Sequence, residues 1–255
     1  MKKVALIFFG LSYYKYFNHW TCGNYIVDFR NSYENYQKFI YSYFHKLGYE
    51  IDVYFCTNIL EEEHLIELLN MYKPKKYTMI KNYNNKFESR NTKLSSAVKC
   101  CLDSGVKYDV CLITRFDLLF QKEFETCNIN FETINIVSIL EKPNLICDNF
   151  YLLPYRLLEE FYKLIENNIY TRFHDIRKPL SKISEINYIY SEHVVVSKLS
   201  FYKIIRTQIN LEDLIDFKKK ERNNNFFILF LIILLILIIM YFINTHNRVY
   251  SINLV

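Results

Sequence analysis

Residues 1 to 114 alternate between strand patterns and helix patterns, and this alternation limits the possible folds more than any other feature. The run Val4–Phe9 is continuously apolar and is followed by Gly10, which is typical of a strand buried on both faces. Three further strands are expected at residues 49–55, 76–81 and 110–114, with helices between them at 31–47, 58–71 and 89–104. Such alternation predicts an α/β fold with a Rossmann-like, mostly parallel sheet covered by helices.

The remainder of the chain is less regular. Strands are expected at residues 134–140 and near 150, and helices at 154–166 and 190–200. The stretch between Gly10 and residue 30 is rich in polar and aromatic side chains and is expected to be a long loop. We therefore expect one α/β domain over residues 1–217.

Composition and charge exclude several classes of protein. With 51% hydrophobic residues, the chain has enough apolar side chains for a core, so it is neither disordered nor a small disulfide scaffold. Of its formal net charge of +5, residues 218–255 carry +4, so the domain itself is almost neutral. A nucleic-acid partner is not expected, because such proteins spread their cations over a face of the domain. The seven cysteines show no C-x-x-C spacing and are expected to be free thiols.

An uncharged run of 18 residues, 226–243, predicts a transmembrane helix. As a helix it would be about 27 Å long, close to the thickness of a hydrocarbon core. The basic segment 218–225 precedes it, and only Arg248 follows as a cation. The positive-inside rule then places the N-terminal domain in the cytosol, with 244–255 as a short tail. We expect a single-pass membrane protein whose bilayer anchor lies at the end of this chain.

A charged pair follows the strand expected at 110–114. If the chain stays extended there, Arg115 and Asp117 lie on the same face, because side chains alternate with a period of two. Ligands of open α/β sheets bind outside the carboxyl ends of the strands. The carboxylate could hold a divalent cation and the guanidinium could clamp a diphosphate. The alternative is a structural ion pair that closes the edge of the sheet.

Four segments of the chain resemble a known family. They are KVALIFFG, KYDVCLITRFDLLF, CDNFYLLPYRLLEEFYKLI and SEHVVVSKL. Together they look like small glycosyltransferases with the A-type nucleotide-sugar fold that carry an R-x-D segment in place of Asp-x-Asp. The resemblance spans residues 1 to about 205, and the matching positions are Gly10, Tyr108 with Asp109, Arg115 with Asp117, Asp148 with Phe150, and Glu192.

The resemblance implies a reaction and a set of roles. A nucleoside diphosphate sugar would be the donor, and Gly10 and Arg115 would contact it. Asp117 would hold Mn²⁺ or Mg²⁺ to neutralise the leaving diphosphate. Asp148 or Glu192 would take the proton from the acceptor hydroxyl. The chain departs from the family where Cys147 precedes Asp148, since paired acids are usual there, and where Leu11, Ser12 and Tyr13 replace Gln-x-Arg type residues.

Two rival functions remain open. The chain could be a tail-anchored binding or scaffold protein that keeps a glycosyltransferase-like domain without catalysis. It could also be a nucleotidyltransferase, although the usual glycine-rich phosphate loop is absent from the sequence. The segment Glu61–His64 resembles a metalloprotease helix only superficially, because the second histidine is missing. It is interpreted as the acidic first turn of a helix. His193 beside Glu192 and His174 beside Asp175 are interpreted as ordinary surface or core residues.

Overall fold

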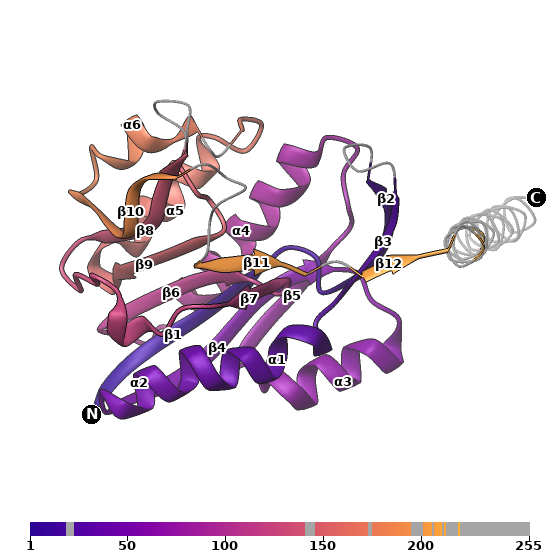
Figure 1. Cartoon of the computed structure of the whole chain (residues 1–255), viewed down its shortest axis with the longest axis horizontal. Coiled ribbons are helices and arrows are strands. Elements are labelled where there is room, and N and C mark those ends of the chain that lie inside the picture. Colours follow the sequence, from indigo (N-terminus) through magenta and orange to yellow (C-terminus); the bar gives the residue numbers. More distant parts are fainter. Residues whose placement is uncertain are drawn as a thin grey trace, which may run out of the picture. The chain divides into compact units, whose positions relative to one another are not determined.

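A seven-stranded sheet forms the centre of the computed structural model, which describes residues 1–18, 23–140, 146–172, 175–194, 201–205, 207–210, 212 and 219 (Figure 1). Its order is β10-β8-β9-β6-β1-β4-β5. Its strands are β1 (Lys2–Phe9), β4 (Tyr49–Asn58), β5 (Lys76–Ile80), β6 (Val110–Arg115), β8 (Ile134–Leu140), β9 (Phe150–Pro154) and β10 (Ile186–Val194). All neighbours run parallel except β9, which is antiparallel to β6 and β8. The mostly parallel α/β sheet expected from the sequence is confirmed.

The chain forms two compact units. One contains residues 1–14 and 26–207, and the other contains residues 15–25 and 208–255. The first unit holds the seven-stranded sheet, all the helices described below, and an antiparallel pair of β7 (Leu118–Phe120) with β11 (Tyr202–Ile204). A separate three-stranded sheet consists of β2 (Tyr13–Asn18), β3 (Gly23–Asp28) and β12 (Thr207–Ile209). The expectation of a long loop between Gly10 and residue 30 is thus wrong, because β2 and β3 lie within this stretch.

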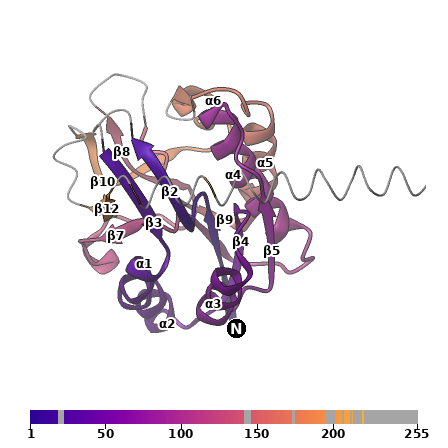
Figure 2. The same cartoon turned by 90° about the vertical axis from the view of Figure 1, so that its right-hand side faces the viewer.

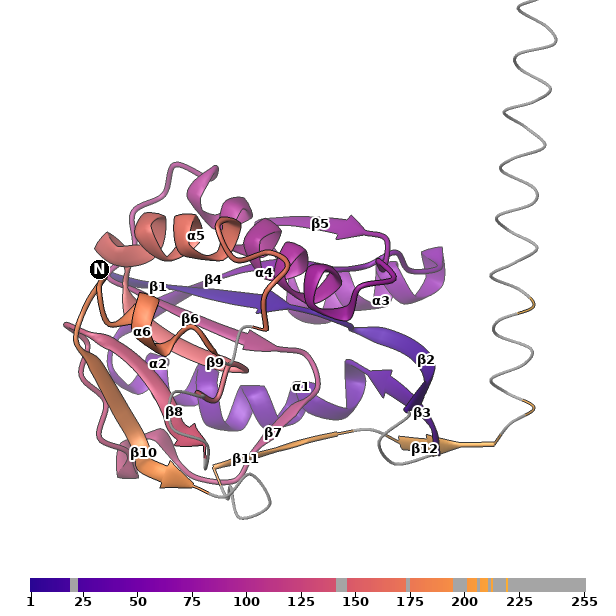
Figure 3. The same cartoon turned by 90° about the horizontal axis from the view of Figure 1, so that it is seen from above.

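Helices cover both faces of the seven-stranded sheet. Figure 2 shows α1, α2 and α3 on one side and α4, α5 and α6 on the other, and Figure 3 shows β1 between β4 and β6. Their bounds are α1 (Arg30–Tyr36), η1 (Gln37–Tyr41), α2 (Ser42–Lys46), α3 (Glu62–Tyr72), α4 (Lys86–Leu102), α5 (Leu158–Glu166) and α6 (Arg177–Leu180). Two short 3₁₀ turns, η2 (Phe124–Thr126) and η3 (Tyr155–Leu157), complete the helical elements.

Strand β1 is buried on both faces, as its apolar run predicts. Alternate side chains enter two cores: one contains Val4, Leu6 and Phe8, and the other contains Ala5, Ile7 and Phe9. The first core includes side chains of α1, α2 and α3, and the second includes side chains of α4 and α5. Because successive side chains of a strand point to opposite faces, an unbroken apolar run is what a central strand needs.

Local signals explain two of the helix ends. Asn85 caps α4 by accepting hydrogen bonds from the amides of Phe87 and Glu88, so this helix begins before the expected Ser89. Gly48 adopts a positive φ of 78° directly after the helix over residues 30–46. That helix is one continuous unit in which a π-helical turn, η1, interrupts the α-helical pattern.

Three expectations concern the end of the chain. The helix expected over 190–200 is wrong as far as Val194, because β10 occupies residues 186–194, and residues 195–200 lie outside the description. Across the residues that are described, no helix is long and apolar enough to cross a membrane. The expected span at 226–243 lies outside the described residues. All six cysteines in the described ranges are free, and five of them are buried.

Candidate functional site

The candidate site lies between β1 and β6, where the order in which the chain adds strands to the sheet reverses. From β1 the chain continues to β4 and β5 on one side, and it then returns to β6 on the other side of β1. Register pairs Phe9 with Arg115, so the carboxyl ends of β1 and β6 end level with each other. The crevice outside such a switch point is where open α/β sheets bind ligands. Gly10 and Asp117 therefore both lie at this edge.

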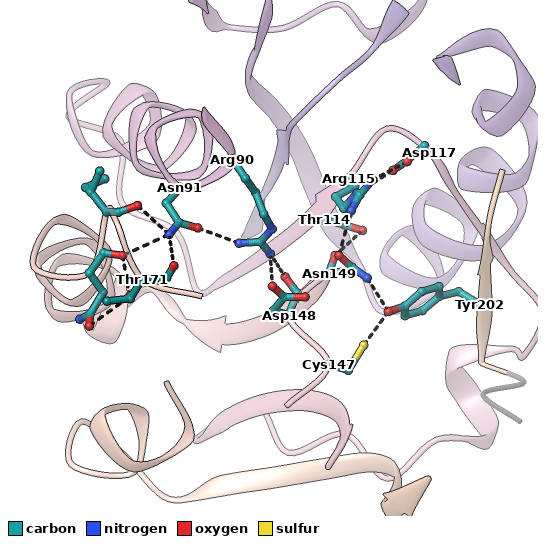
Figure 4. Close-up of polar contacts among 12 residues, drawn as sticks. Arg90, Asn91, Thr114, Arg115, Asp117, Cys147, Asp148, Asn149, Thr171 and Tyr202 are labelled. Atoms are coloured by element: carbon teal, nitrogen blue, oxygen red, sulfur yellow. Dashed lines mark hydrogen bonds and ion pairs between the residues drawn. The ribbon is translucent and has the colours of Figure 1, made fainter. Parts of the chain in front are cut away.

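Antiparallel β9 adds a third segment to the same edge. Phe150, the first residue of β9, pairs with Thr114 near the end of β6. The residues that precede β9, Cys147 to Asn149, are thereby brought to the carboxyl end of β6. The Thr114 hydroxyl donates to the Asn149 carbonyl at 3.4 Å, which joins the two segments (Figure 4).

Arg115 ends β6, Asp117 lies in the turn that follows, and the two side chains are paired with each other. The guanidinium donates from Nε to Asp117 Oδ1 at 2.7 Å and from Nη2 to Oδ2 at 2.5 Å. A third bond runs from Nη1 to Asn149 Oδ1 at 3.1 Å. The Asp117 side chain is 2% exposed and that of Arg115 is 18% exposed. The chain does not stay extended after β6, as the same-face expectation required, because residues 116–117 form a turn. The contact is the bidentate ion pair given above as the structural alternative.

The electrostatic surroundings hold Arg115 in its charged form. Burial by itself lowers the pKa of this guanidinium, but the carboxylate of Asp117 outweighs burial. Asp148 and Tyr202 add smaller contributions in the same direction, and the net effect is a raised pKa. Arg115 is therefore a permanent cation at the edge of the sheet.

A chain of polar contacts continues from Asn149 into the core. Asn149 Nδ2 donates to the Tyr202 hydroxyl at 2.9 Å, and that hydroxyl also lies 2.5 Å from Cys147 Sγ. Burial raises the pKa of Cys147 to about 12, so its thiol stays protonated. Because the Asn149 amide donates to Tyr202, its oxygen faces Arg115 and its orientation is fixed.

Asp148, a candidate base, is 5% exposed in its side chain and pairs with Arg90 of α4. The distance from Arg90 Nη2 to Asp148 Oδ2 is 2.9 Å, and the same nitrogen also donates to the Asp148 carbonyl. The Arg90 guanidinium lies 5.1 Å from the centre of the Phe9 ring, at the end of β1. A second Arg–Asp pair thus flanks Asn149 on the side opposite Arg115, as Figure 4 shows.

Gly10 has a backbone conformation that favours glycine. Its φ is 104°, its amide donates to the Cys56 carbonyl at 3.2 Å, and an added Cβ would meet no atom within 4 Å. The next turn is held by β4, because the Ser12 amide donates to Thr57 Oγ1 at 3.1 Å and Asn58 Nδ2 donates to the Tyr13 carbonyl at 3.0 Å. Gly10 therefore lets the chain turn sharply away from the edge.

Glu192, the other candidate base, lies in β10. The pairing of β10 with β8 shifts register between Ser191 and His193, on either side of this residue. The structure describes its backbone only, so its expected role stays a prediction. The same holds for His193, while His174 lies outside the described residues. Glu62 and Glu63 occupy the first turn of α3, which confirms the interpretation of this acidic segment.

The residues present do not fit the expected cation at Asp117. Both carboxylate oxygens already accept from a guanidinium of the same strand end, and the side chain is almost fully buried. Within the described ranges, no group of three His, Cys, Asp or Glu side chains could hold a metal ion. A divalent cation would have to approach beside Arg115, whose positive charge repels it.

Sequence reasoning did not find Arg90, Asn149 and Tyr202. Asn149 directly follows the candidate base Asp148, and this adjacency is the one sequence signal that could have identified it. Arg90 lies in the first half of the expected third helix, but nothing local distinguishes it from a surface cation. Tyr202 reaches the site only through the pairing of β11 with β7, which the sequence does not predict.

Comparisons with known proteins add little to this description. Neither a scan against protein-family models nor a search of curated proteins finds a match. Among solved structures, a protein of Aquifex aeolicus VF5 is similar with a TM-score of 0.40 and 16% identity, over 81% of this chain and 94% of that one. A protein of Desulfovibrio desulfuricans G20 with the provisional name nucleotide-diphospho-sugar transferase has a TM-score of 0.38 and 10% identity, over 76% and 83% of the two chains. At TM-scores below 0.5 these similarities assign neither a family nor a function to this chain.

Proposed function

We propose that this protein is a glycosyltransferase that moves a sugar from a nucleoside diphosphate donor to an acceptor. The observation that carries the proposal is the position of Arg115, a partly buried and permanently charged guanidinium at the switch point between β1 and β6. Ligands of open α/β sheets bind at this point, and an arginine fork suits a diphosphate. The segments that resemble small glycosyltransferases, given above, supply Gly10, Arg115 and Asp148 to the same edge.

The chemistry follows from charge development. When the bond between the sugar and the diphosphate breaks, negative charge accumulates on the leaving group. A fixed cation beside that group stabilises the transition state more than the ground state. Arg115 is held by Asp117 and Asn149, so little reorganisation is needed when the charge develops.

Asp148 and Glu192 stay the proposed bases for the acceptor hydroxyl. Asp148 is the weaker of the two, because its carboxylate is held by Arg90 and would have to leave that pair to accept a proton. We expect Glu192→Gln to lower kcat more than Asp148→Asn, once donor binding is shown. The reverse order would make Asp148 the base.

Calorimetry on the full-length chain in detergent tests the proposed function. UDP, GDP, CDP and ADP are titrated with and without 1 mM Mn²⁺, and the nucleotide that binds is then offered as its sugar conjugates. We expect one nucleoside diphosphate to bind and the corresponding nucleotide sugar to be consumed slowly by water. Failure of every nucleotide in both buffers would contradict the proposal.

The structure also favours a second function, that of a non-catalytic binding or scaffold protein. The observation is that, within each of the two Arg–Asp pairs, the guanidinium and the carboxylate bind each other without any ligand. Such a protein would keep the fold and bind no donor, or bind a nucleotide without consuming its sugar conjugate. The same titration followed by the turnover assay separates the two functions.

We further propose that residues 226–243 anchor the protein in a bilayer, with the α/β domain in the cytosol. The support is the uncharged run and the cations that precede it. A glycosylation tag after Val255 should then be modified in the secretory lumen, whereas a tag before residue 200 should not. The opposite labelling would overturn this orientation.

A further inference from the structure

We propose that Asp117 is a positioning residue for Arg115, and that the donor diphosphate binds at this edge without a divalent cation. The inference rests on the proposed function, and it reassigns the carboxylate that the family resemblance gives to a metal ion. It follows from how the donors and acceptors of this strand end are already used.

The carboxylate of Asp117 faces a guanidinium rather than an open site. Each of its oxygens accepts one bond from Arg115, at 2.7 and 2.5 Å, and 2% of the side chain is exposed. Each oxygen keeps one further lone pair, but the side chain is almost fully buried, so a cation would have to enter beside the guanidinium. The positive charge of Arg115 repels a cation at that position, and displacing the guanidinium would leave it without its counter-charge.

The guanidinium, in contrast, retains capacity to bind a ligand. It has five N–H donors, of which the described contacts use three: two to Asp117 and one to Asn149. One N–H on each terminal nitrogen is left, within the part of the chain that the structure describes. The side chain is also more exposed than that of its partner, at 18% against 2%. The accessible member of the pair is thus the cation.

The backbone that carries the pair is fixed from two sides. The Tyr36 hydroxyl of α1 donates to the Arg115 carbonyl at 2.6 Å and accepts from the Leu118 amide at 3.0 Å. The Ser32 hydroxyl of the same helix donates to the Phe116 carbonyl. On the other side the Ile205 amide donates to the Asp117 carbonyl at 2.8 Å. A guanidinium on so rigid a support loses little freedom when it binds a ligand.

The test is calorimetry of the full-length chain in detergent with UDP, GDP, CDP and ADP, first in EDTA and then in 1 mM Mn²⁺, with inorganic pyrophosphate as a further probe. For the wild type we expect dissociation constants within about threefold of each other in the two buffers. Asp117→Asn should weaken binding at least about tenfold in both buffers, and Asp117→Glu should restore part of it. Arg156→Lys, at an exposed pair with Glu132, is the matched control and should bind as the wild type does.

Each outcome decides something. Wild-type binding that needs Mn²⁺ would overturn the inference and leave the proposed function standing. Absence of binding by any nucleoside diphosphate in either buffer would overturn both. If Asp117→Asn binds normally in EDTA, its positioning role is wrong. Should that variant fail to fold, as judged by circular dichroism, the wild-type comparison between EDTA and Mn²⁺ still decides on the cation.

Discussion

A partly buried cation, Arg115, and a fully buried one, Lys93, have opposite surroundings. Arg115, at the carboxyl end of β6, has a carboxylate and an amide as partners. Lys93, on α4, is 1% exposed, and its ammonium donates to neutral oxygens of Asn82 and Ser89. Asp117 raises the pKa of Arg115 against the effect of burial, whereas burial lowers the pKa of Lys93 to about 8.

The difference teaches which of the two cations is suited to a ligand. A guanidinium anchored by Asp117 keeps its charge and its geometry at any physiological pH. The ammonium of Lys93 has no carboxylate among the contacts described, so its charge is held at a cost that the rest of the fold must offset. Arg115 is thus suited to bind an anion, and Lys93 is a titratable group of the core.

The largest expected effect breaks the Arg115 side of the comparison. Asp117→Asn leaves the guanidinium without its counter-charge in a buried setting. We expect the free energy of unfolding to fall by about 3 kcal/mol, the range found when one partner of a buried pair is removed. Urea denaturation measures this directly, and a loss below about 1 kcal/mol would show that the pair is solvated.

Lys93→Met tests the other side through pH. The unfolded chain keeps this proton up to about pH 10.4, whereas folded Lys93 releases it near pH 8. Between these values the folded state gains stability as pH rises, and below pH 8 it bears the full cost of the buried charge. The wild type should therefore gain about 2 kcal/mol relative to Lys93→Met between pH 7.5 and 10. Urea titrations of both proteins at four pH values check this, and parallel pH profiles would contradict it.

Tyr36→Phe tests how much the hydrogen bonds to the backbone around Arg115 contribute to stability. The change removes one hydroxyl that donates to the Arg115 carbonyl and accepts from the Leu118 amide, and both backbone groups would be left without it. We expect a loss of about 1 to 2 kcal/mol in unfolding free energy. A thermal or urea transition unchanged from the wild type would mean that another group or water replaces the hydroxyl.

The smallest effect is expected at an exposed pair of the same chemistry. Arg156 contacts Glu132 at 3.2 Å, with side chains 58% and 81% exposed. Glu132→Gln should change the unfolding free energy by no more than about 0.5 kcal/mol, because water screens such pairs. A change as large as that of Asp117→Asn would show that burial does not distinguish the two pairs.

Much of the fold could be predicted because its signals are local. The apolar run of residues 4–9 predicts a strand and the glycine at position 48 predicts a helix end, each from a few neighbouring residues. The structure confirms both predictions. The helix expected over 190–200 was wrong where β10 continues to Val194, since a short apolar run there fits a strand as well as a helix. The strands β2 and β3 escaped prediction because their aromatic side chains were interpreted as loop residues.

The site could be predicted only in part because it depends on strand order. Arg115 and Asp117 are two residues apart, so their proximity could be predicted, but the turn at 116–117 that brings them together was not. Asn149 reaches Arg115 because β9 runs antiparallel beside β6, and no local pattern reveals that reversal. Lys93 was missed for a different reason, since lysines are rarely buried and composition gives no warning of an exception.

Arginine side-chain NMR of the full-length chain tests the central claim most directly, namely that Arg115 binds the donor diphosphate. The Nε–H resonance of Arg115 is assigned from its loss in Arg115→Lys, and that of Arg156 serves as the internal control. Saturating UDP in EDTA should shift the Arg115 resonance and leave the Arg156 resonance in place. An unchanged Arg115 resonance under conditions where UDP is bound would contradict the account.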